Sequence, residues 1–237
     1  MPGAEAIGER LKVVLATIYL LFNEGYYSAR QPHPLRKELC YEAMRLCHFL
    51  LENEQTNKPE VNALMALMCF HASRFDARAN EQGELILYAD QDTGLWNSEL
   101  VSRGGYFLRC AATGNTLTRY HLEAGIAYWN TQGNDSIRKW EQILHYYNLL
   151  LQIDYSPIAA LNRTFALAKV KGKPAAIIEA EKLGLEDYHF YYALLGELYS
   201  GVDDEQAKEN YRKALAKSPA GFERRTIEKK LTELEGS

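Results

Sequence analysis

Two acidic residues in a short polar turn, Asp90 and Asp92, are the side chains best placed for chemistry in this sequence. A pair of hard carboxylate oxygens at this spacing can hold a divalent cation. The same residue types also form Asx turns and cap helix ends without any ligand, and this structural account is the preferred one. We therefore expect neither a metal site nor a bound cofactor.

Other patterns that support catalysis do not occur in the chain. It contains no GxSxG nucleophile elbow, no glycine-rich phosphate loop and no HExxH zinc motif. His71 and His121 fall within predicted helices, where a hydrogen-bonded histidine of the core or its rim is commoner than a catalytic one. The sequence therefore predicts a protein that is not an enzyme.

Tyrosine is unusually frequent, with sixteen copies against eight phenylalanines. The tyrosines that bear on binding lie in the C-terminal part of the chain: Tyr146, Tyr147, Tyr191, Tyr192 and Tyr199. Most are expected to pack between helices. A minority can line a concave surface that binds a peptide, because tyrosine is favoured at interfaces.

The overall composition is that of an ordinary folded protein, with 47% hydrophobic and 24% charged residues in a chain of 237. A formal net charge of -4 argues against a nucleic-acid surface, because binding phosphates needs clustered Lys and Arg. The four cysteines include no CxxC pair, so we expect buried, reduced thiols in a cytoplasmic protein. The apolar run from Val13 to Phe22 is too short to span a membrane.

Hydrophobic periodicity predicts a chain of helices. They cover about residues 5–22, 35–51, 59–78, 97–110, 118–129, 137–153, 157–170, 174–183 and 221–234, with a helical hairpin over 192–219. The first helix is expected to end at Asn23-Glu24-Gly25, since glycine commonly follows the last helical turn. The periodicity fails at Leu85-Ile86-Leu87-Tyr88, which predicts a short extended excursion near residues 84–96.

The hairpin over 192–219 resembles a tetratricopeptide repeat (TPR), shortened by one residue at the turn. The residues that carry the pattern are Tyr192, Leu195, Gly196, Tyr199, Ala207, Tyr211, Ala214 and Pro219. Gly201 suits the end of its first helix, and Asp203 with Gln206 suits the start of the second. One such hairpin cannot bury its own apolar face, so neighbouring hairpins must stack on it.

The predicted fold class is therefore all-α: a helical bundle that continues into a TPR-like right-handed array of helical hairpins. Residues 1–135 are expected to form an N-terminal helical subdomain with an extended, acidic loop at 83–97. Residues 136–237 are expected to form the TPR-like hairpins, closed by a C-terminal capping helix with a polar outer face.

Four local strings occur along nearly the whole chain: Tyr19-Leu20-Leu21-Phe22-Asn23-Glu24-Gly25-Tyr26, His71 with Arg74, Asp90-Gln91-Asp92 followed by Trp96, and Leu161-Asn162-Arg163. Together, and in this order, they resemble the C-terminal extension of bacterial extracytoplasmic-function sigma factors, in the group with a TPR-containing tail. That family usually has Asp after the histidine and Arg after the acidic triplet, where this chain has Ala72 and Thr93. A charge network between those two places is therefore in question here.

The resemblance implies that DNA-opening and promoter-reading domains precede this segment, so that the chain is a fragment or an isolated extension. It implies a non-enzymatic regulatory role in the bacterial cytoplasm, through the sigma core or its contact with RNA polymerase, with no direct binding of nucleic acid or membrane. We expect the contact residues to share one polar site: Asn23, Glu24, Asp90, Gln91, Asp92 and Trp96. In the competing account these residues cap helices and hold the excursion against the bundle.

Two other functions stay open. A freestanding TPR-like adaptor would bind a peptide or a regulatory protein in its groove, and a reading frame that begins at Met1 would favour it. A small-molecule or metal-dependent enzyme would use the turn from Asp90 to Asp92. It would need an enclosed pocket with convergent ionisable groups near that turn.

Overall fold

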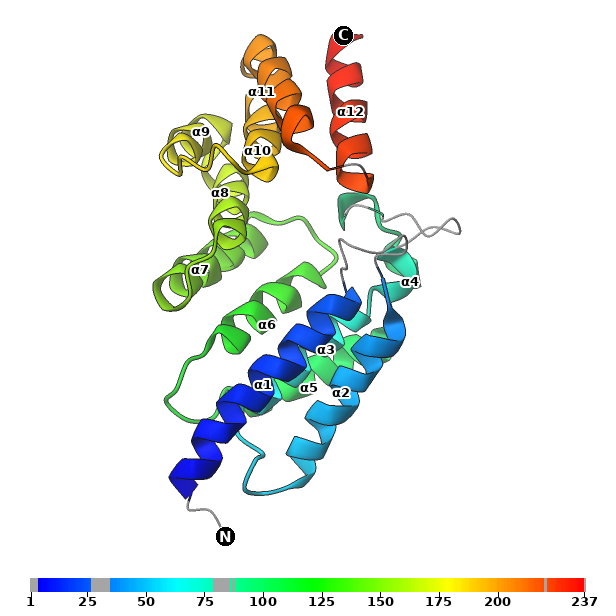
Figure 1. The fold of residues 1–237 in the computed structure, drawn as a ribbon, viewed down its shortest axis with the longest axis vertical. Coiled ribbons are helices and arrows are strands. Elements are labelled where there is room, and N and C mark those ends of the chain that lie inside the picture. Colours follow the sequence, from blue (N-terminus) through cyan, green and yellow to red (C-terminus); the bar gives the residue numbers. More distant parts are fainter. Residues whose placement is uncertain (1–3, 27–34, 79–85, 87, 220, 237) are drawn as a thin grey trace. The chain divides into compact units, whose positions relative to one another are not determined.

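The part of the chain that the structure describes is all-helical, as the hydrophobic periodicity predicts. A computed structural model describes residues 4–26, 35–78, 86, 88–219 and 221–236. Within these ranges lie twelve α-helices and two short 3-10 helices, η1 and η2, and no strand. The chain divides into two compact units, Met1–Gly133 and Asn134–Ser237, each with a hydrophobic core of its own (Figure 1).

The first unit contains α1 to α6 and both 3-10 helices. Their bounds are Ala4–Tyr26 (α1), Lys37–Glu52 (α2), Pro59–Ala72 (α3), Phe75–Arg78 (α4), Tyr88–Asp90 (η1), Thr93–Leu95 (η2), Ser98–Ala111 (α5) and Arg119–Asn130 (α6). The central helix is α3, which packs against α1, α2, α5 and α6. Its residues from Val61 to Phe70 are all buried, because a helix surrounded by others needs an apolar surface all round.

The predicted helix over 59–78 is in fact two helices, α3 and α4, because the backbone turns at Ser73. The Ser73 carbonyl accepts a hydrogen bond from the Asn97 amide at 2.8 Å, so it is not used to continue the helix. The Asn97 side chain in turn caps α5 by accepting from the Leu100 amide at 3.0 Å. The two hydrogen bonds of Asn97 therefore link the end of α3 to the start of α5.

The predicted helix end at Asn23-Glu24-Gly25 is wrong, since α1 continues to Tyr26. Gly25 instead allows a close approach between helices. A Cβ there would lie 2.8 Å from Cys40 Sγ and 2.9 Å from the Arg36 carbonyl oxygen, which is closer than van der Waals contact permits. The Arg36 amide donates to the Gly25 carbonyl at 2.6 Å, so glycine marks where the start of α2 meets α1.

The predicted extended excursion near 84–96 is also corrected. Part of it, including Leu85 and Leu87, lies outside the described residues, and the described part forms the 3-10 helices η1 and η2 rather than a strand. Local hydrogen bonds explain the difference. The Gln91 amide donates to the Tyr88 carbonyl at 3.4 Å, and the Asp92 side chain accepts from the Gly94 amide at 2.8 Å. These local bonds close short turns and replace the ladder that a strand would need.

The second unit contains α7 to α12, and each helix packs against the next one along the chain. Their bounds are Ile137–Ile153 (α7), Pro157–Lys171 (α8), Lys173–Glu181 (α9), His189–Tyr199 (α10), Asp204–Lys217 (α11) and Phe222–Glu235 (α12). Side-chain caps begin three of them: Ser136 accepts from the Lys139 amide at 3.3 Å, Ser156 from the Ala159 amide at 3.1 Å, and Asp203 from the Gln206 amide at 3.1 Å. These are the helical hairpins that the sequence predicts.

The α10–α11 hairpin has the close packing that its small residues predict. A Cβ at Gly196 would lie 2.6 Å from Cδ1 of Tyr211, and the Ala207 and Ala214 side chains are fully buried. Gly201 ends the first helix with φ of 73°, a conformation that favours glycine. The hairpin is then joined to α12, because Glu197 accepts from the Tyr211 hydroxyl at 3.2 Å and forms an ion pair with Lys230.

None of the described helices combines the length and the apolar character that crossing a bilayer requires.

Cys40, Cys47 and Cys69 are buried free thiols, and burial raises the pKa of each to about 12. Cys110 is a free thiol that is only half-buried.

Candidate interaction site

A buried arginine, Arg74, lies at the centre of a group of aromatic side chains in the first unit. It is 8% exposed and stands between α3 and α4. Its Nη2 donates to the Tyr26 hydroxyl at 2.9 Å, and its Cζ lies 5.2 Å from the ring centre of Tyr88 and 6.0 Å from that of Trp96. These contacts compensate the guanidinium for lost water. Arg74 therefore connects the end of α1 to both 3-10 turns.

A second arginine strengthens the connection to α1. Arg78 donates through Nη1 to the same Tyr26 hydroxyl at 3.0 Å, and its Cζ lies 3.8 Å from the centre of the Tyr26 ring. The His71 ring also packs against Tyr26, with the two ring centres 4.7 Å apart. We call this set the Arg74 cluster; its members are Tyr26, His71, Arg74, Arg78, Tyr88 and Trp96.

The electrostatics of the cluster keep its histidine uncharged. Burial first, and then the positive charges of Arg74 and Arg78, hold the pKa of His71 well below the usual 6.5. The imidazole is therefore neutral at neutral pH and packs as an aromatic ring. His121 is also structural: its Nδ1 accepts from the Thr118 amide at 3.2 Å, which closes a capping box at the start of α6.

The acidic triplet lies beside this cluster; Gln91 is buried, whereas Asp90 and Asp92 are both exposed. Gln91 is 8% exposed and donates through Nε2 to the Ile86 carbonyl at 3.2 Å, while the Ile86 amide donates to the Arg78 carbonyl at 2.8 Å. Asp92 caps η2, as its Asx-turn interpretation predicts. The Asp90 carboxylate is exposed. Gln91 and Asp92 thus hold the turn in shape, and Asp90 is presented to solvent.

Three of the predicted residues remain. Trp96 is half-buried and belongs to the Arg74 cluster, whereas Asn23 and Glu24 lie on the last turns of α1. Asn23 is half-buried and hydrogen bonds to the Tyr19 hydroxyl, and Glu24 is exposed. One link between the two predicted groups runs from Tyr26 through Arg74 to Trp96.

Several polar atoms of this region are buried and lack a hydrogen-bond partner among the residues described. They are Nδ1 of His71, Oε1 of Gln91 and Nε1 of Trp96. Buried polar groups are nearly always paired in folded proteins, so a partner such as water is expected at each of these three atoms. The described residues contain no group of three or more side chains suited to hold a metal ion.

Sequence reasoning selected the acidic turn but not the arginines and tyrosines that hold it. Tyr26 and Arg74 belong to the strings that carry the family resemblance, so a signal for them was available. Arg78 and Tyr88 gave no such signal. Their role arises from tertiary contacts, including the hydrogen bond from the Tyr88 hydroxyl to the Asn130 carbonyl at 2.5 Å, which anchors η1 to α6.

The second unit has a groove of about 310 Å³ beside α10 and α11. Three of the tyrosines singled out from the sequence line it, Tyr191, Tyr192 and Tyr199, whereas Tyr146 and Tyr147 are not among its lining residues. Its polar lining residues are Glu181, Glu186, Gln206, Asn210 and Lys213. The Tyr199 hydroxyl donates to Glu181 at 2.7 Å, which places a carboxylate at the groove.

Comparison with known proteins gives two similarities. A family of unknown function, DUF6596, matches residues 10–112, which include the whole Arg74 cluster and none of the second unit. The chain is also 34% identical over 200 residues to an uncharacterized protein of Rhizobium meliloti (strain 1021). The match covers 83% of this chain and 47% of the relative, so the chain spans about half the length of that relative. No solved structure matches the chain.

Proposed function

We propose that this chain is a non-enzymatic regulatory and protein-interaction domain of a bacterial extracytoplasmic-function sigma factor. It acts in the cytoplasm, on the sigma core or on the contact of that core with RNA polymerase. One observation carries the proposal. Three of the four strings that resemble the family meet in the Arg74 cluster: Tyr26 ends the first, His71 and Arg74 form the second, and Trp96 closes the third.

The length of the relative supports a domain that works attached to others. The match covers 47% of the Rhizobium meliloti protein, so about half of that protein lies outside it. In our proposal the corresponding part of the present protein is the sigma core. The second unit, a series of packed helical hairpins, is the kind of scaffold that presents surfaces to other proteins.

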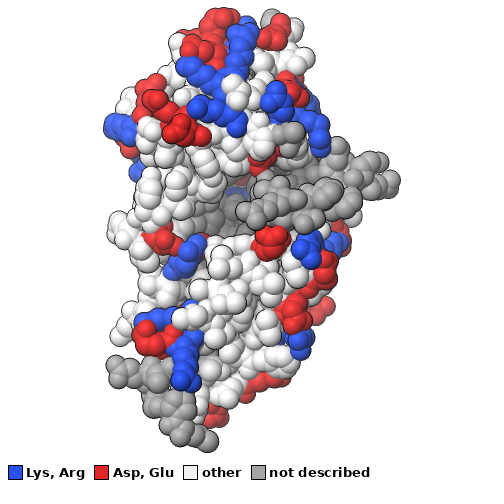
Figure 2. Space-filling model, in the orientation of Figure 1, with Lys and Arg blue, Asp and Glu red and all other residues white. Residues whose placement is uncertain are grey.

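The surface charge favours a protein partner over a nucleic acid. Basic and acidic side chains are interspersed on the face shown in Figure 2, where neither sign forms one continuous patch. The formal net charge of the chain is -4. A surface that neutralises phosphates would instead gather Lys and Arg on one face.

Within the predicted site, the exposed carboxylates are the groups able to contact a partner. Asp90, Asp92 and Glu24 are exposed and Gln91 is buried, but the Asp92 carboxylate already accepts the hydrogen bond that caps η2. We therefore assign Asp90 to contact, and Gln91 with Asp92 to positioning. Because Gln91 and Asp92 hold the turn in one conformation, an exposed carboxylate on it can accept hydrogen bonds from a partner with little loss of entropy.

The test compares three alanine variants for retention of sigma core domains and of bacterial core RNA polymerase. Asp90→Ala is expected to weaken binding about tenfold with an unchanged melting temperature, as for loss of a charge-assisted hydrogen bond. Glu54→Ala removes an exposed carboxylate between α2 and α3 and should change neither quantity. Asp92→Ala should lower the melting temperature because it removes a cap.

Absence of retention of either partner at micromolar concentration would contradict the proposal. Equal binding by the Asp90→Ala and Glu54→Ala variants would remove Asp90 from the contact. It would leave the structural account of the acidic turn as the better one.

A second candidate function is peptide binding in the groove of the second unit. The observation that favours it is the buried Asn210, 5% exposed, whose Nδ2 donates to the Gln206 carbonyl at 2.8 Å within the groove lining. Its carbonyl oxygen is thereby left to accept from a peptide amide. Panning a displayed peptide library against the chain tests this. Binders lost with Tyr192→Ala but kept with Tyr155→Ala, an exposed tyrosine elsewhere, would support it, and absence of binders would exclude it.

A further inference from the structure

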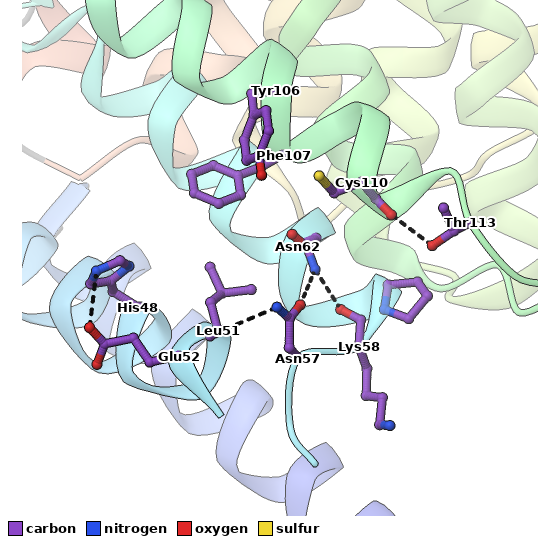
Figure 3. A pocket seen from close by; sticks show the side chains of 11 residues that line it. His48, Leu51, Glu52, Asn57, Lys58, Asn62, Tyr106, Phe107, Cys110 and Thr113 are labelled. Atoms are coloured by element: carbon purple, nitrogen blue, oxygen red, sulfur yellow. Dashed lines mark hydrogen bonds and ion pairs between the residues drawn. The ribbon is translucent and has the colours of Figure 1, made fainter. Parts of the chain in front are cut away.

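The first unit contains a cleft of about 600 Å³, apart from the Arg74 cluster (Figure 3). Three elements form it: the C-terminal end of α2, the start of α3, and the C-terminal half of α5. Its volume falls within the range of sites that hold small molecules. No residue that the sequence analysis assigned to a site lines this cleft.

A buried amide, Asn62, forms the floor of the cleft. Asn62 is 7% exposed, and both protons of its Nδ2 are used: one bonds to Asn57 Oδ1 at 2.8 Å and one to the Lys58 carbonyl at 3.1 Å. Asn57 is itself oriented, because its Nδ2 donates to the Leu51 carbonyl at 3.0 Å. Turning the Asn62 amide over would place its oxygen against two acceptors, so the network determines which way it points.

The orientation leaves one acceptor directed into the cleft. Figure 3 shows the Asn62 carbonyl oxygen pointing away from Asn57 and Lys58, toward the space below Phe107 and Cys110. That oxygen has no hydrogen-bond partner among the described residues. A nearly buried acceptor held rigidly by its own amide protons is well suited to receive a donor from a ligand, since little entropy is lost on binding.

The walls of the cleft define the rest of the ligand. Leu51 from α2 and Phe107 from α5 both present apolar surface to the cleft, one below the other in Figure 3. Charges at the rim have both signs, from the Glu52 carboxylate on one edge and the Lys58 ammonium group on another, and Glu52 lies 3.6 Å from the His48 ring. Such a rim gives no strong preference for a charged ligand.

We infer that this cleft binds a small, neutral aromatic compound of one or two rings that donates an N–H or O–H hydrogen bond to Asn62. The ring packs between Leu51 and Phe107. This site is separate from the proposed contact with a sigma core, and neither proposal depends on the other.

Cys110 provides a direct readout of occupancy. It lines the cleft and is half-buried, whereas Cys40, Cys47 and Cys69 are fully buried and serve as internal controls. A ligand seated on Asn62 should shield the Cys110 thiol from iodoacetamide. The rate of alkylation at each cysteine can be followed on the full chain by mass spectrometry.

The probes are indole, which carries a ring N–H, and 1-methylindole, which has the same shape but no donor. Indole at millimolar concentration should slow alkylation of Cys110 severalfold, and half-protection should need about three- to tenfold more 1-methylindole, as for one lost hydrogen bond. In an Asn62→Ala variant the two probes should protect equally. A merely structural role of Asn62 would not change this ratio.

Three results would overturn the inference. They are no protection of Cys110 by indole at millimolar concentration, equal protection by both probes in the unaltered chain, and a preference for indole that persists in the Asn62→Ala variant. The comparison of probes on the unaltered chain decides the matter if that variant does not fold.

Discussion

Two neighbouring glycines in α5, Gly104 and Gly105, are expected to respond oppositely to alanine. A Cβ at Gly104 would lie 2.7 and 2.8 Å from two ring carbons of Phe70 on α3, whereas one at Gly105 would meet only Nη1 of Arg109, at 3.7 Å. Alanine in a helix interior gains about 1 kcal/mol over glycine at either position. Overpacking against a buried ring costs about 1–3 kcal/mol, and Phe70 is only 1% exposed. Gly105→Ala should therefore stabilise by up to about 1 kcal/mol and Gly104→Ala destabilise by up to about 2 kcal/mol.

The assay is urea denaturation followed by tryptophan fluorescence, in a chain that also carries Trp140→Phe. This leaves Trp96 and Trp129, which both lie in the first unit, so the signal reports the unit that contains α5. Adding Phe70→Leu should reduce the difference between the two alanine variants, because the smaller side chain makes room for the new methyl group. A Gly104→Ala variant as stable as Gly105→Ala would refute the close packing of α3 on α5.

Two further predictions concern caps and pH. Asn97→Ala and Asp203→Ala each remove the acceptor that caps a helix, so each should lower the free energy of unfolding by about 1 kcal/mol. The tryptophan assay measures the Asn97 variant, and urea denaturation followed by circular dichroism measures the Asp203 variant, because Asp203 lies in the second unit. Unchanged stability in both would contradict the cap geometry. Because burial and the two arginines hold the pKa of His71 well below 6.5, the unfolded chain takes up this proton first as the pH falls. Stability should therefore decrease on acidification below about pH 6.5, and His71→Gln should reduce that slope. An identical slope in the variant, measured by urea denaturation from pH 7 downward, would show that His71 is not buried and neutral.

Local signals in the sequence predicted most helices and several of their ends. Asn97, Ser156 and Asp203 were identifiable as caps because a cap acts over three residues, and Gly201 because its conformation is a property of the turn itself. The helical hairpins followed from the same short-range patterns. In contrast, Gly25 was misinterpreted, because glycine at a helix end and glycine at a close helix contact look the same in sequence.

The candidate sites divide in a similar way. The acidic turn and Trp96 could be selected from residue type and order, as could the three tyrosines that line the groove of the second unit. The burial of Gln91 between two exposed carboxylates, and the contact of Trp96 with Arg74, depended on tertiary structure. The cleft over Asn62 could not be predicted from the sequence, because most of its lining residues come from three separate helices.

The amino-acid order alone determined an all-helical chain whose last third forms hairpins, because helix periodicity, caps and small contact residues act between near neighbours. Tertiary structure decided where the chemistry lies. Arg74 meets Tyr26 and Tyr88, and Asn62 faces Phe107, only because helices distant in sequence pack against the same core. Such contacts depend on the positions of whole helices, which no short pattern of residues encodes.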